Sequence, residues 1–238
     1  MLAPGGRAAI YAAPRPDDPL WAFGSTTLGY DAARGALVPR PPPLRLTPER
    51  WDELTAEPRR YGFHATLKAP FRLAAGMDLE RLSEAISRFC EGRRAIAPFP
   101  LEVRAIGEFL ALVPASAPED LAPLAAAVTT SFDGFRAGLS QAERERRLPA
   151  KLSARQAGYL ERFGYPYVLE EFRFHMSLTG KVPDPILREE LRLALAEGWH
   201  REAGGAPFGL DALVLFVQPA PEDRFLIRER HAFERPAS

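Results

Sequence analysis

Two stretches of this chain repeat one short phrase: RYGFHATLKAPF at residues 60–71 and EFRFHMSLTGKV at residues 171–182. Each contains a phenylalanine, a histidine, a variable residue, a hydroxyl residue and a leucine. His64 and Thr66 therefore correspond to His175 and Ser177. The chain has four histidines, and a phrase of this kind arises by chance at roughly 1% per histidine, so two copies indicate a duplicated unit. We call residues 64–67 and 175–178 the two histidine motifs.

The segments that follow each motif have the same order. A β-strand carrying the motif is followed by a helix, from about residue 79 after the first motif and from Asp184-Pro185 after the second. Strands beginning FPLEV and FGLDALV come next. The repeated order predicts an α+β fold with two pseudo-symmetric lobes, each a mostly antiparallel sheet flanked by helices, and a cleft between the lobes. We interpret residues 1–238 as one functional domain.

The remaining chain gives further local signals. An apolar strand is expected at residues 7–14, followed by a proline-punctuated stretch and a loop through the three prolines at 41–43. Helices are expected from Thr47-Pro48 to about residue 55 and from 119 to 132. The arginine-rich connector at about 140–164 has capping-box spacing twice, so two short helices broken at Pro149 are predicted there. Strands are expected in the segments 99–114, 208–219 and 224–233.

Side chains alternate between the two faces of a strand, so each motif has an apolar face and a polar face. In the first copy His64, Thr66 and Lys68 share the polar face, and in the second Arg173 does so with His175 and Ser177. Two facing imidazoles suit general acid–base catalysis, because one ring can accept a proton while the other donates one. The hydroxyls can donate hydrogen bonds to anionic oxygens, as phosphoryl chemistry requires.

Other interpretations of the two histidines stay open. A strand histidine is often a core residue whose ring is hydrogen-bonded to the backbone. Zinc could take His64 and His175, but no carboxylate or cysteine stands at ligand spacing near either. We expect no metal and no cofactor. His200 and His231 lack the phrase and are interpreted as surface or structural residues, and Cys90, on the apolar side of a helix, as an inert thiol.

Composition limits the classes of partner. With 31 basic and 31 acidic residues and a formal net charge of zero, the chain is not expected to bind long nucleic acid, which usually requires a basic excess. No apolar run is long enough to span a membrane, and no signal peptide is recognisable. One cysteine excludes an intrachain disulfide, as expected in a reducing compartment, so a cytoplasmic location is expected. The oligomeric state is not predicted.

The paired motifs resemble those of the two-histidine (2H) phosphoesterase superfamily. The runs RRYGFHATLKAPFRL and GYPYVLEEFRFHMSLTGKV, with the opening IYAAP, are similar to a subgroup of unknown function that occurs with bacterial phosphonate-utilisation genes. The resemblance implies a bilobal fold with one motif per lobe and catalysis without a metal. Carried over by motif position, it implies that His64 and Thr66 form one catalytic pair, and His175 and Ser177 the other.

Residues around the motifs are candidates for holding the substrate. They are the cations and aromatic side chains nearest the motifs: Lys68, Arg60, Tyr61, Arg173 and Tyr167. The cations could neutralise phosphate oxygens, although solvated surface charges are the alternative. Tyr165 and Tyr167, in YPYV, could support a sugar or base, with loop packing as the alternative.

The leading functional hypothesis is a cyclic phosphodiesterase, an enzyme that opens a small cyclic or sugar-linked phosphodiester in phosphonate metabolism. The sequence does not assign the acid and base roles. RNA-end processing, as a 2′,3′-cyclic phosphodiesterase or a 2′–5′ RNA ligase-like protein, is the first alternative. The second is a non-catalytic module that binds a phosphorylated small molecule.

Overall fold

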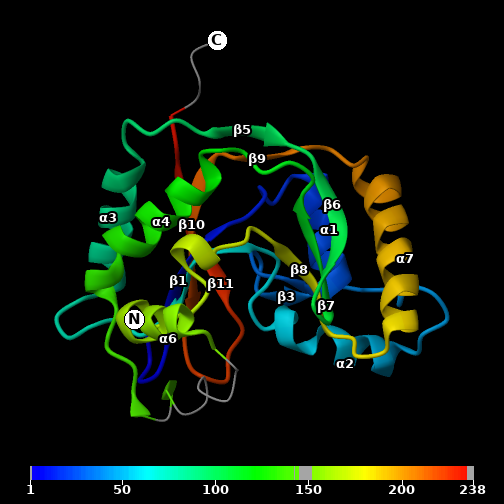
Figure 1. Ribbon diagram of the computed structural model, residues 1–238, viewed down its shortest axis with the longest axis horizontal. Helices are drawn as coiled ribbons and strands as arrows, with labels where there is room; N and C mark the ends of the chain where they lie inside the picture. Colours follow the sequence, from blue (N-terminus) through cyan, green and yellow to red (C-terminus); the bar gives the residue numbers. More distant parts are fainter. Residues whose placement is uncertain (1, 142, 145–151, 235–238) are drawn as a thin grey trace.

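A computed structural model describes residues 2–141, 143–144 and 152–234 of the chain. Its centre is a seven-stranded antiparallel sheet (Figure 1). In spatial order the strands are β11 (Leu226–Ala232), β10 (Ala212–Gln218), β1 (Arg7–Ala12), β4 (Ala65–Phe71), β8 (Met176–Lys181), β7 (Phe109–Pro114) and β6 (Leu101–Ile106). Two small sheets pair β2 (Tyr30–Asp31) with β3 (Ala36–Leu37) and β5 (Ile96–Phe99) with β9 (Phe208–Leu210). The α+β class is confirmed.

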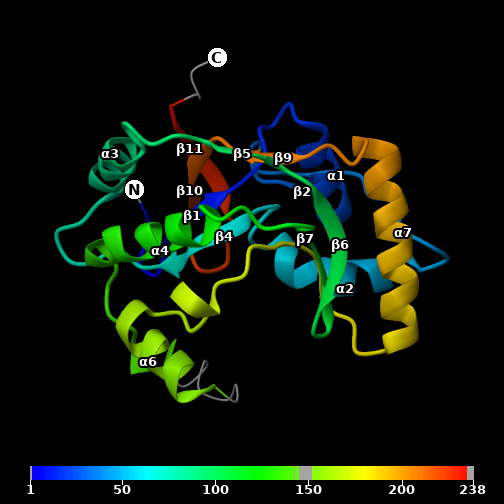
Figure 2. The same ribbon diagram turned by 45° about the horizontal axis from the view of Figure 1, so that its top comes forward.

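The helices form two groups on opposite sides of the molecule, as Figures 1 and 2 show. One group is α3 (Leu79–Cys90), α4 (Leu121–Ser131) and α6 (Ala154–Phe163). Within this group α3 packs on β10 and β11, and α4 packs on β4. The other group is α1 (Pro19–Leu28), α2 (Pro48–Arg59) and α7 (Pro185–Ala203). There α2 packs on β8 and α7 on β6 and β7. None of the described helices is long and apolar enough to cross a membrane.

The two halves of the large sheet meet at the strands that carry the histidine motifs. β4 and β8 pair at a single register position, Ala65 with Met176, and from there run apart in opposite directions because the pairing is antiparallel. The expectation of two separate sheets is therefore corrected: one continuous sheet joins the two halves through this pair. The junction brings the first residues of the two motif strands together.

Each half of the sheet is completed by a hairpin from the other half of the sequence. The β6–β7 hairpin follows the first motif yet pairs with β8, which carries the second motif. The β10–β11 hairpin follows the second motif and pairs with β1, the neighbour of β4. The connecting strands β5 and β9 cross between the two sides and pair with each other (Figure 2). The element order suits an internal duplication, which stays a prediction.

Local capping explains the helix starts that the sequence predicts. Asp184 accepts hydrogen bonds from Ile186 N and Leu187 N at the start of α7, and a cap of this kind contributes about 1 kcal/mol. The predicted capping box at the start of α6 is present between Ser153 and Gln156. Reciprocal hydrogen bonds also join Ser140 and Glu143. The break predicted at Pro149 lies outside the described residues.

Two helices differ from the sequence-based expectation. α1 occupies the stretch expected to be broken by prolines, with Asp18 as N-cap and Gly29 in the left-handed region as C-cap. Its buried residues surround most of the helix, so no one-sided apolar period marks it in the sequence. α2 continues through Arg59 rather than ending near residue 55, and Pro58 lies in its last turn.

A close contact with α1 fixes the residue before the first histidine. Phe63 is fully buried, and its ring occupies the space beside Gly24 of α1. A Cβ added to Gly24 would lie 2.2 Å from the Phe63 ring, so glycine is required there for packing. Burial of an aromatic ring of this size contributes about 2–3 kcal/mol. The backbone that presents His64 is thereby anchored to the helix layer.

Candidate functional site

Both histidines lie immediately before their strands, on one face of the sheet junction. The side chains of Ala65 and Met176 are fully buried on the opposite face. Because neighbouring residues alternate, His64 and Thr66 of the first motif and His175 and Ser177 of the second share the other face. All four are partly exposed. The register of the junction places His64 across from Ser177 and His175 across from Thr66.

The His64 ring is held at both nitrogens. Its Nδ1 lies 2.9 Å from the Gly62 carbonyl and its Nε2 lies 3.1 Å from Thr66 Oγ1. A carbonyl only accepts, so Nδ1 carries the hydrogen and neutral Nε2 is left as the acceptor for the threonine hydroxyl. Gly62 has φ +76°, and a Cβ there would lie 2.6 Å from Ala32 Cβ. Glycine at this position lets the carbonyl meet the ring.

Tyr11 of β1 is a further residue at this site. Its ring stacks on His64 with centroids 3.6 Å apart and an interplanar angle of 17°, and it pairs across the strands with Thr66. Tyr11 is fully buried, and its hydroxyl has no hydrogen-bond partner within the part of the chain that the structure describes. We did not single out this residue from the sequence. A tyrosine within the apolar run RAAIYAAP was the available signal.

The environment of His64 disfavours its charged form. The pKa of His64 is lowered to about 3, chiefly by burial and to a smaller extent by a positive charge on His175, while the hydrogen bond from Nδ1 to the Gly62 carbonyl acts in the opposite direction. Burial also raises the pKa of Tyr11, with smaller contributions in the same direction from Tyr61 and Tyr165. His64 is therefore a neutral base at physiological pH, stacked on a neutral phenol.

His175 repeats part of this arrangement. Its Nδ1 lies 2.8 Å from the Arg173 carbonyl, so the donor again points to the backbone two residues upstream and Nε2 is left for chemistry. Its ring centroid is 5.6 Å from that of Phe109 on β7. Burial lowers the pKa of His175, while the bond to Arg173 acts in the opposite direction. Ser177 pairs across the strands with Ala111 of β7.

Lys68 does not share the face of His64 and Thr66, contrary to the simple alternation. β1 and β4 pair Tyr11 with Thr66 but Ile10 with Lys68, and the register shift between these pairs is a β-bulge. Consecutive residues of β1 face opposite sides, so their partners Thr66 and Lys68 do too. The sequence-based placement of Lys68 is therefore wrong.

On its own side of the sheet Lys68 lies beneath α4. Its side chain is 4% exposed, and its amine donates to the Thr129 carbonyl at 2.9 Å and to Asp133 at 3.3 Å. Burial lowers the pKa of Lys68 to about 8, although Asp133 raises it. A buried ion pair with these partners fixes α4 and the turn after it against β4. The basis for assigning Lys68 to a substrate phosphate is removed.

Arg60 and Tyr61 lie beside the first motif and contact the turn between β10 and β11. The Arg60 guanidinium donates to the Pro221 carbonyl, and the Arg60 carbonyl accepts from Phe225 N at 2.9 Å. The Tyr61 ring stacks on Phe225 with centroids 5.4 Å apart and lies 6.4 Å from the His64 ring. Tyr61 is thus near the histidine, whereas the Arg60 side chain points to the turn.

The candidates upstream of the second motif differ from each other. The carbonyl of Arg173 orients His175, and its guanidinium has no hydrogen bond or ion pair with residues in the described ranges. Tyr167 is 45% exposed, and its ring meets Tyr165 edge-on at 5.5 Å. Tyr165 interacts electrostatically with Tyr11, the residue whose ring stacks on His64.

The register indicates one cation on the motif face that the sequence analysis did not name. Arg104 of β6 pairs with Ala111, which pairs with Ser177, so all three side chains lie on one face. Arg104 is exposed and its guanidinium is 2.6 Å from Glu102. The alternation in LEVRAI was the signal for it. Among the described residues no group of three or more histidine, cysteine or acidic side chains could hold a metal ion.

The other two histidines and the cysteine are away from the motifs. His200 is exposed on α7. His231 of β11 is buried, with Nε2 3.3 Å from Ser83 Oγ on α3, a contact that joins the helix to the strand. Cys90 is buried, and burial raises its pKa to about 11, which keeps it a thiol.

Comparison with known protein families matches residues 66–226 to DUF1045, described as a protein of unknown function. The match covers more than half of the chain; it begins at Thr66, two residues after His64, and includes the whole second motif. The chain therefore belongs to the DUF1045 family.

Two relatives carry a functional name, "Ribose 1,5-bisphosphate phosphokinase PhnN". The protein from Janthinobacterium sp. (strain Marseille) is 36% identical over 234 residues, which are 95% of this chain and 51% of that protein. The protein from Laribacter hongkongensis (strain HLHK9) is 35% identical over 217 residues, 90% of this chain and 48% of that protein. The chain thus spans about half the length of these relatives.

Among solved structures, a conserved protein of unknown function from Agrobacterium tumefaciens str. C58 is similar with a TM-score of 0.45 and 11% identity. The alignment covers 95% of this chain and 85% of the other.

Proposed function

We propose that this chain is a metal-independent phosphoesterase that opens a small cyclic or sugar-linked phosphodiester by acid–base catalysis with His64 and His175. The observation that carries the proposal is the common orientation of the two rings. Each donates Nδ1–H to the carbonyl two residues upstream and keeps Nε2 free of the backbone, on the same face of the β4–β8 junction. A base and an acid on either side of a phosphorus atom require this arrangement.

The proposed step is hydrolysis of one P–O bond. Neutral His64 Nε2 removes a proton from water as the water oxygen forms a bond to phosphorus. Protonated His175 gives its proton to the oxygen that leaves as the P–O bond breaks, so the product is a phosphomonoester with a free hydroxyl. The Thr66 hydroxyl, which donates to His64 Nε2 without substrate, turns to a non-bridging oxygen and frees Nε2 for the water. Ser177 donates to the other non-bridging oxygen, where negative charge also increases in the transition state.

The pKa shifts support this division of roles. His64 is the ring whose charged form is strongly disfavoured, and charge on His175 lowers its pKa further. A single proton shared by the pair therefore resides on His175, which leaves His64 as the base. An anionic phosphodiester between the rings would raise both pKa values and favour the protonated acid.

The names of the relatives suggest the substrate class. Both are named for ribose 1,5-bisphosphate, and opening a cyclic phosphodiester on a phosphorylated ribose yields a ribose bisphosphate. A reaction of this class would supply such a compound to a kinase. The resemblance to the phosphonate-associated subgroup supports a role in phosphonate metabolism. Zero net charge favours a compact substrate over long RNA.

The test is a panel of cyclic phosphodiesters assayed in excess EDTA: a ribose cyclic phosphate with a second phosphate, a nucleoside 2′,3′-cyclic phosphate, and an oligonucleotide with the same terminus. We expect turnover of the sugar phosphate at the same rate with and without EDTA. Loss of activity that zinc or manganese restores would contradict the metal-independent mechanism.

Two further outcomes separate the alternatives. A preference of about a hundredfold for the oligonucleotide, equal to about 2.7 kcal/mol at the transition state, would instead indicate RNA-end processing. Binding of the sugar phosphate without turnover would indicate a binding module.

A further inference from the structure

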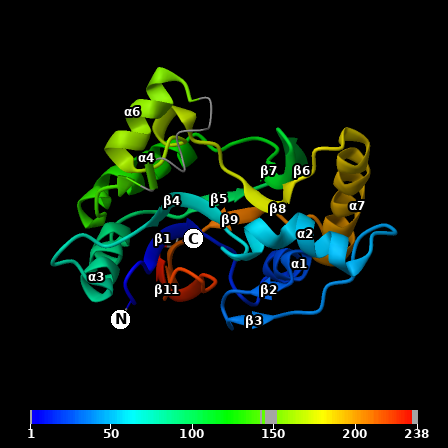
Figure 3. The same cartoon turned by 90° about the horizontal axis from the view of Figure 1, so that it is seen from below.

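A second candidate ligand site lies at the C-terminal end of α2. A cavity of about 730 Å³, open to solvent, is bordered by this helix end, the β2–β3 hairpin and the turn between β10 and β11. Figure 3, a view from below, shows the β2–β3 hairpin between α2 and β11. Three arginines line the cavity: Arg59 at the end of α2, Arg60 directly after it and Arg224 from the turn. Three guanidiniums at one concave site are a typical arrangement for binding anions.

The three guanidiniums are only partly satisfied by the protein. Arg59 is 14% exposed and donates to Asp52 and Thr55 through one amino nitrogen. Its Nε is buried without a hydrogen-bond partner among the described residues. Leaving a buried donor unpaired costs about 1–3 kcal/mol, more for a charged group. Arg59 therefore keeps one donor, its Nε–H, that the described residues leave without a partner.

Arg224 is the least engaged of the three. Its guanidinium lies 5.5 Å from the centroid of the Tyr30 ring and has no hydrogen bond or ion pair with the residues described here. Burial lowers the pKa of Arg59, and the positive charge of Arg224 lowers it further, so the two cations repel each other. An anion between them would convert this repulsion into two attractive contacts.

The acidic residues of the cavity do not balance these charges one for one. Glu222 and Asp223 also line it, which leaves one excess positive charge against three arginines. Asp223 already accepts a hydrogen bond from Ala220 N at 2.9 Å, within its own turn. Glu222 has no ion pair with an arginine among the described residues. The residues that line the cavity therefore carry one excess positive charge, and Asp52, which is outside the lining, pairs with Arg59.

Neither histidine lines this cavity. The Tyr61 ring is 6.4 Å from the His64 ring and stacks on Phe225. Both rings belong to residues that directly follow a cavity arginine in sequence, Arg60 and Arg224.

We propose that this cavity binds the phosphate group of a small organic phosphate, held by Arg59, Arg60 and Arg224, at a site separate from the two histidines. Guanidinium groups bind phosphate through paired N–H donors, and the free fork of Arg224 offers such a pair. The volume leaves room for the organic part of the ligand beside the phosphate. The site stands on its own geometry and does not depend on the phosphoesterase reaction.

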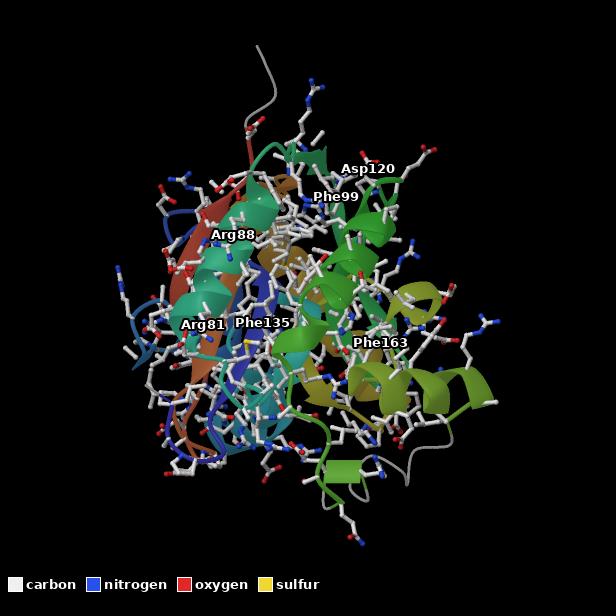
Figure 4. The ribbon with its side chains drawn as sticks, turned by 90° about the vertical axis from the view of Figure 1, so that its left-hand side faces the viewer. Arg81, Arg88, Phe99, Asp120, Phe135 and Phe163 are labelled. Atoms are coloured by element: carbon white, nitrogen blue, oxygen red, sulfur yellow. The ribbon has the colours of Figure 1, made fainter. Side chains whose placement is uncertain are left out.

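The test is isothermal titration of the full chain at constant ionic strength with two probes, inorganic phosphate and ribose 5-phosphate. A H64Q/H175Q double variant removes the contribution of the histidine site. We expect this variant to retain one saturable phosphate site, and Arg224→Gln in the same background to weaken it at least tenfold. Arg88→Gln is the matched control, since Arg88 is an exposed arginine on α3 (Figure 4), far from the cavity in the fold.

Each result of these titrations either supports or overturns the proposed phosphate site. Tighter binding of ribose 5-phosphate than of inorganic phosphate supports an organic ligand, and equal binding overturns that part in favour of the free anion. Absence of saturable binding in the histidine double variant, or equal weakening by Arg224→Gln and Arg88→Gln, overturns the proposal. Arg224→Lys keeps the charge but loses the paired donors, and a weakening between wild type and Arg224→Gln supports phosphate recognition. Thermal melts of each variant exclude loss of folding as the cause.

Discussion

The two histidine motifs have the same backbone contact and different surroundings. In both, Nδ1 donates to the carbonyl two residues upstream, Gly62 for His64 and Arg173 for His175. His64 is stacked on Tyr11 with its Nε2 at Thr66, whereas His175 has the more distant Phe109 ring. The local phrase sets the tautomer of each ring, while the neighbouring strands set how strongly its charge is disfavoured.

Because of this difference, the two histidines are suited to different roles in acid–base catalysis. His64, with its pKa lowered to about 3, is suited to accept a proton, and His175 is suited to hold one. The residues that directly follow the two motifs also differ. Lys68 is buried in an ion pair beneath α4, and Thr179 is buried with its hydroxyl accepting from Leu110 N. In neither copy does this residue contact the histidine.

Removing either ring is expected to have the largest effect. His64→Ala and His175→Ala should each lower kcat/KM for a small cyclic phosphodiester by about a hundredfold to ten-thousandfold, the range for a general acid or base. Both variants should keep their melting temperature within a few degrees, because the apolar face of the strands is unchanged. His200→Ala on α7 is the control. Near-full activity in either motif variant would refute the acid–base pair.

The pH profile tests the division of roles. The base must be neutral, so kcat/KM should fall as the pH drops through the His64 pKa of about 3. The acid must be protonated, and burial holds the pKa of His175 below its usual 6.5. The rate should therefore fall about tenfold per pH unit above that pKa. The optimum is expected on the acidic side of 6.5, and an optimum above pH 8 would contradict these roles.

Substitution of Tyr11 changes the feature that distinguishes the two motifs. Tyr11→Leu removes the ring that stacks on His64 and should cost about 1–3 kcal/mol of stability. It should also move the acidic limb of the pH profile upwards, because water reaches His64. Tyr11→Phe keeps the stack and removes an unpaired hydroxyl, so stability should change by no more than about 1 kcal/mol. Identical profiles for the two variants would show that stacking does not set the His64 pKa.

Lys68→Met is expected to have the smallest effect on activity. The amine is bound to Thr129 and Asp133 on the far side of the sheet, so kcat/KM should stay within about threefold of wild type, less than 1 kcal/mol at the transition state. Urea unfolding measures the structural contribution of the ion pair separately. A large rise in KM with unchanged stability would instead indicate that Lys68 binds the substrate.

Local signals were enough for much of the fold. Asp184-Pro185 and the Ser153–Gln156 pair predict the starts of α7 and α6 because the capping groups are adjacent in sequence. The alternation of side chains along a strand predicts the polar face of each motif correctly as far as Thr66 in the first copy and Ser177 in the second. α1 was missed because it is buried on most sides, so that its sequence has no polar face to set a period.

Non-local contacts account for the rest. The bulge in β4 that turns Lys68 away depends on pairing with Ile10 of β1, which no local pattern records. The Tyr11–His64 stack, and the cavity that joins Arg59 to Arg224, each combine segments far apart in the chain. The pairing of each hairpin with a strand from the other half of the sequence is also non-local. A hairpin sequence specifies its own turn but not the strand that pairs with its outer edge.

The hairpin exchange also determines when the histidine pair can exist. Arg7 pairs with Gln218 across 211 residues of chain. The β6–β7 hairpin beside β8 precedes that strand in the sequence. The β10–β11 hairpin, which reaches β4 through β1, comes last in the sequence. Contacts of such long sequence separation form slowly, because the intervening loop must close first. Neither half of the chain contains both of the strands that flank its motif strand in the final sheet. The two rings therefore come together only when β4 and β8, which belong to different halves of the sequence, have met in one sheet.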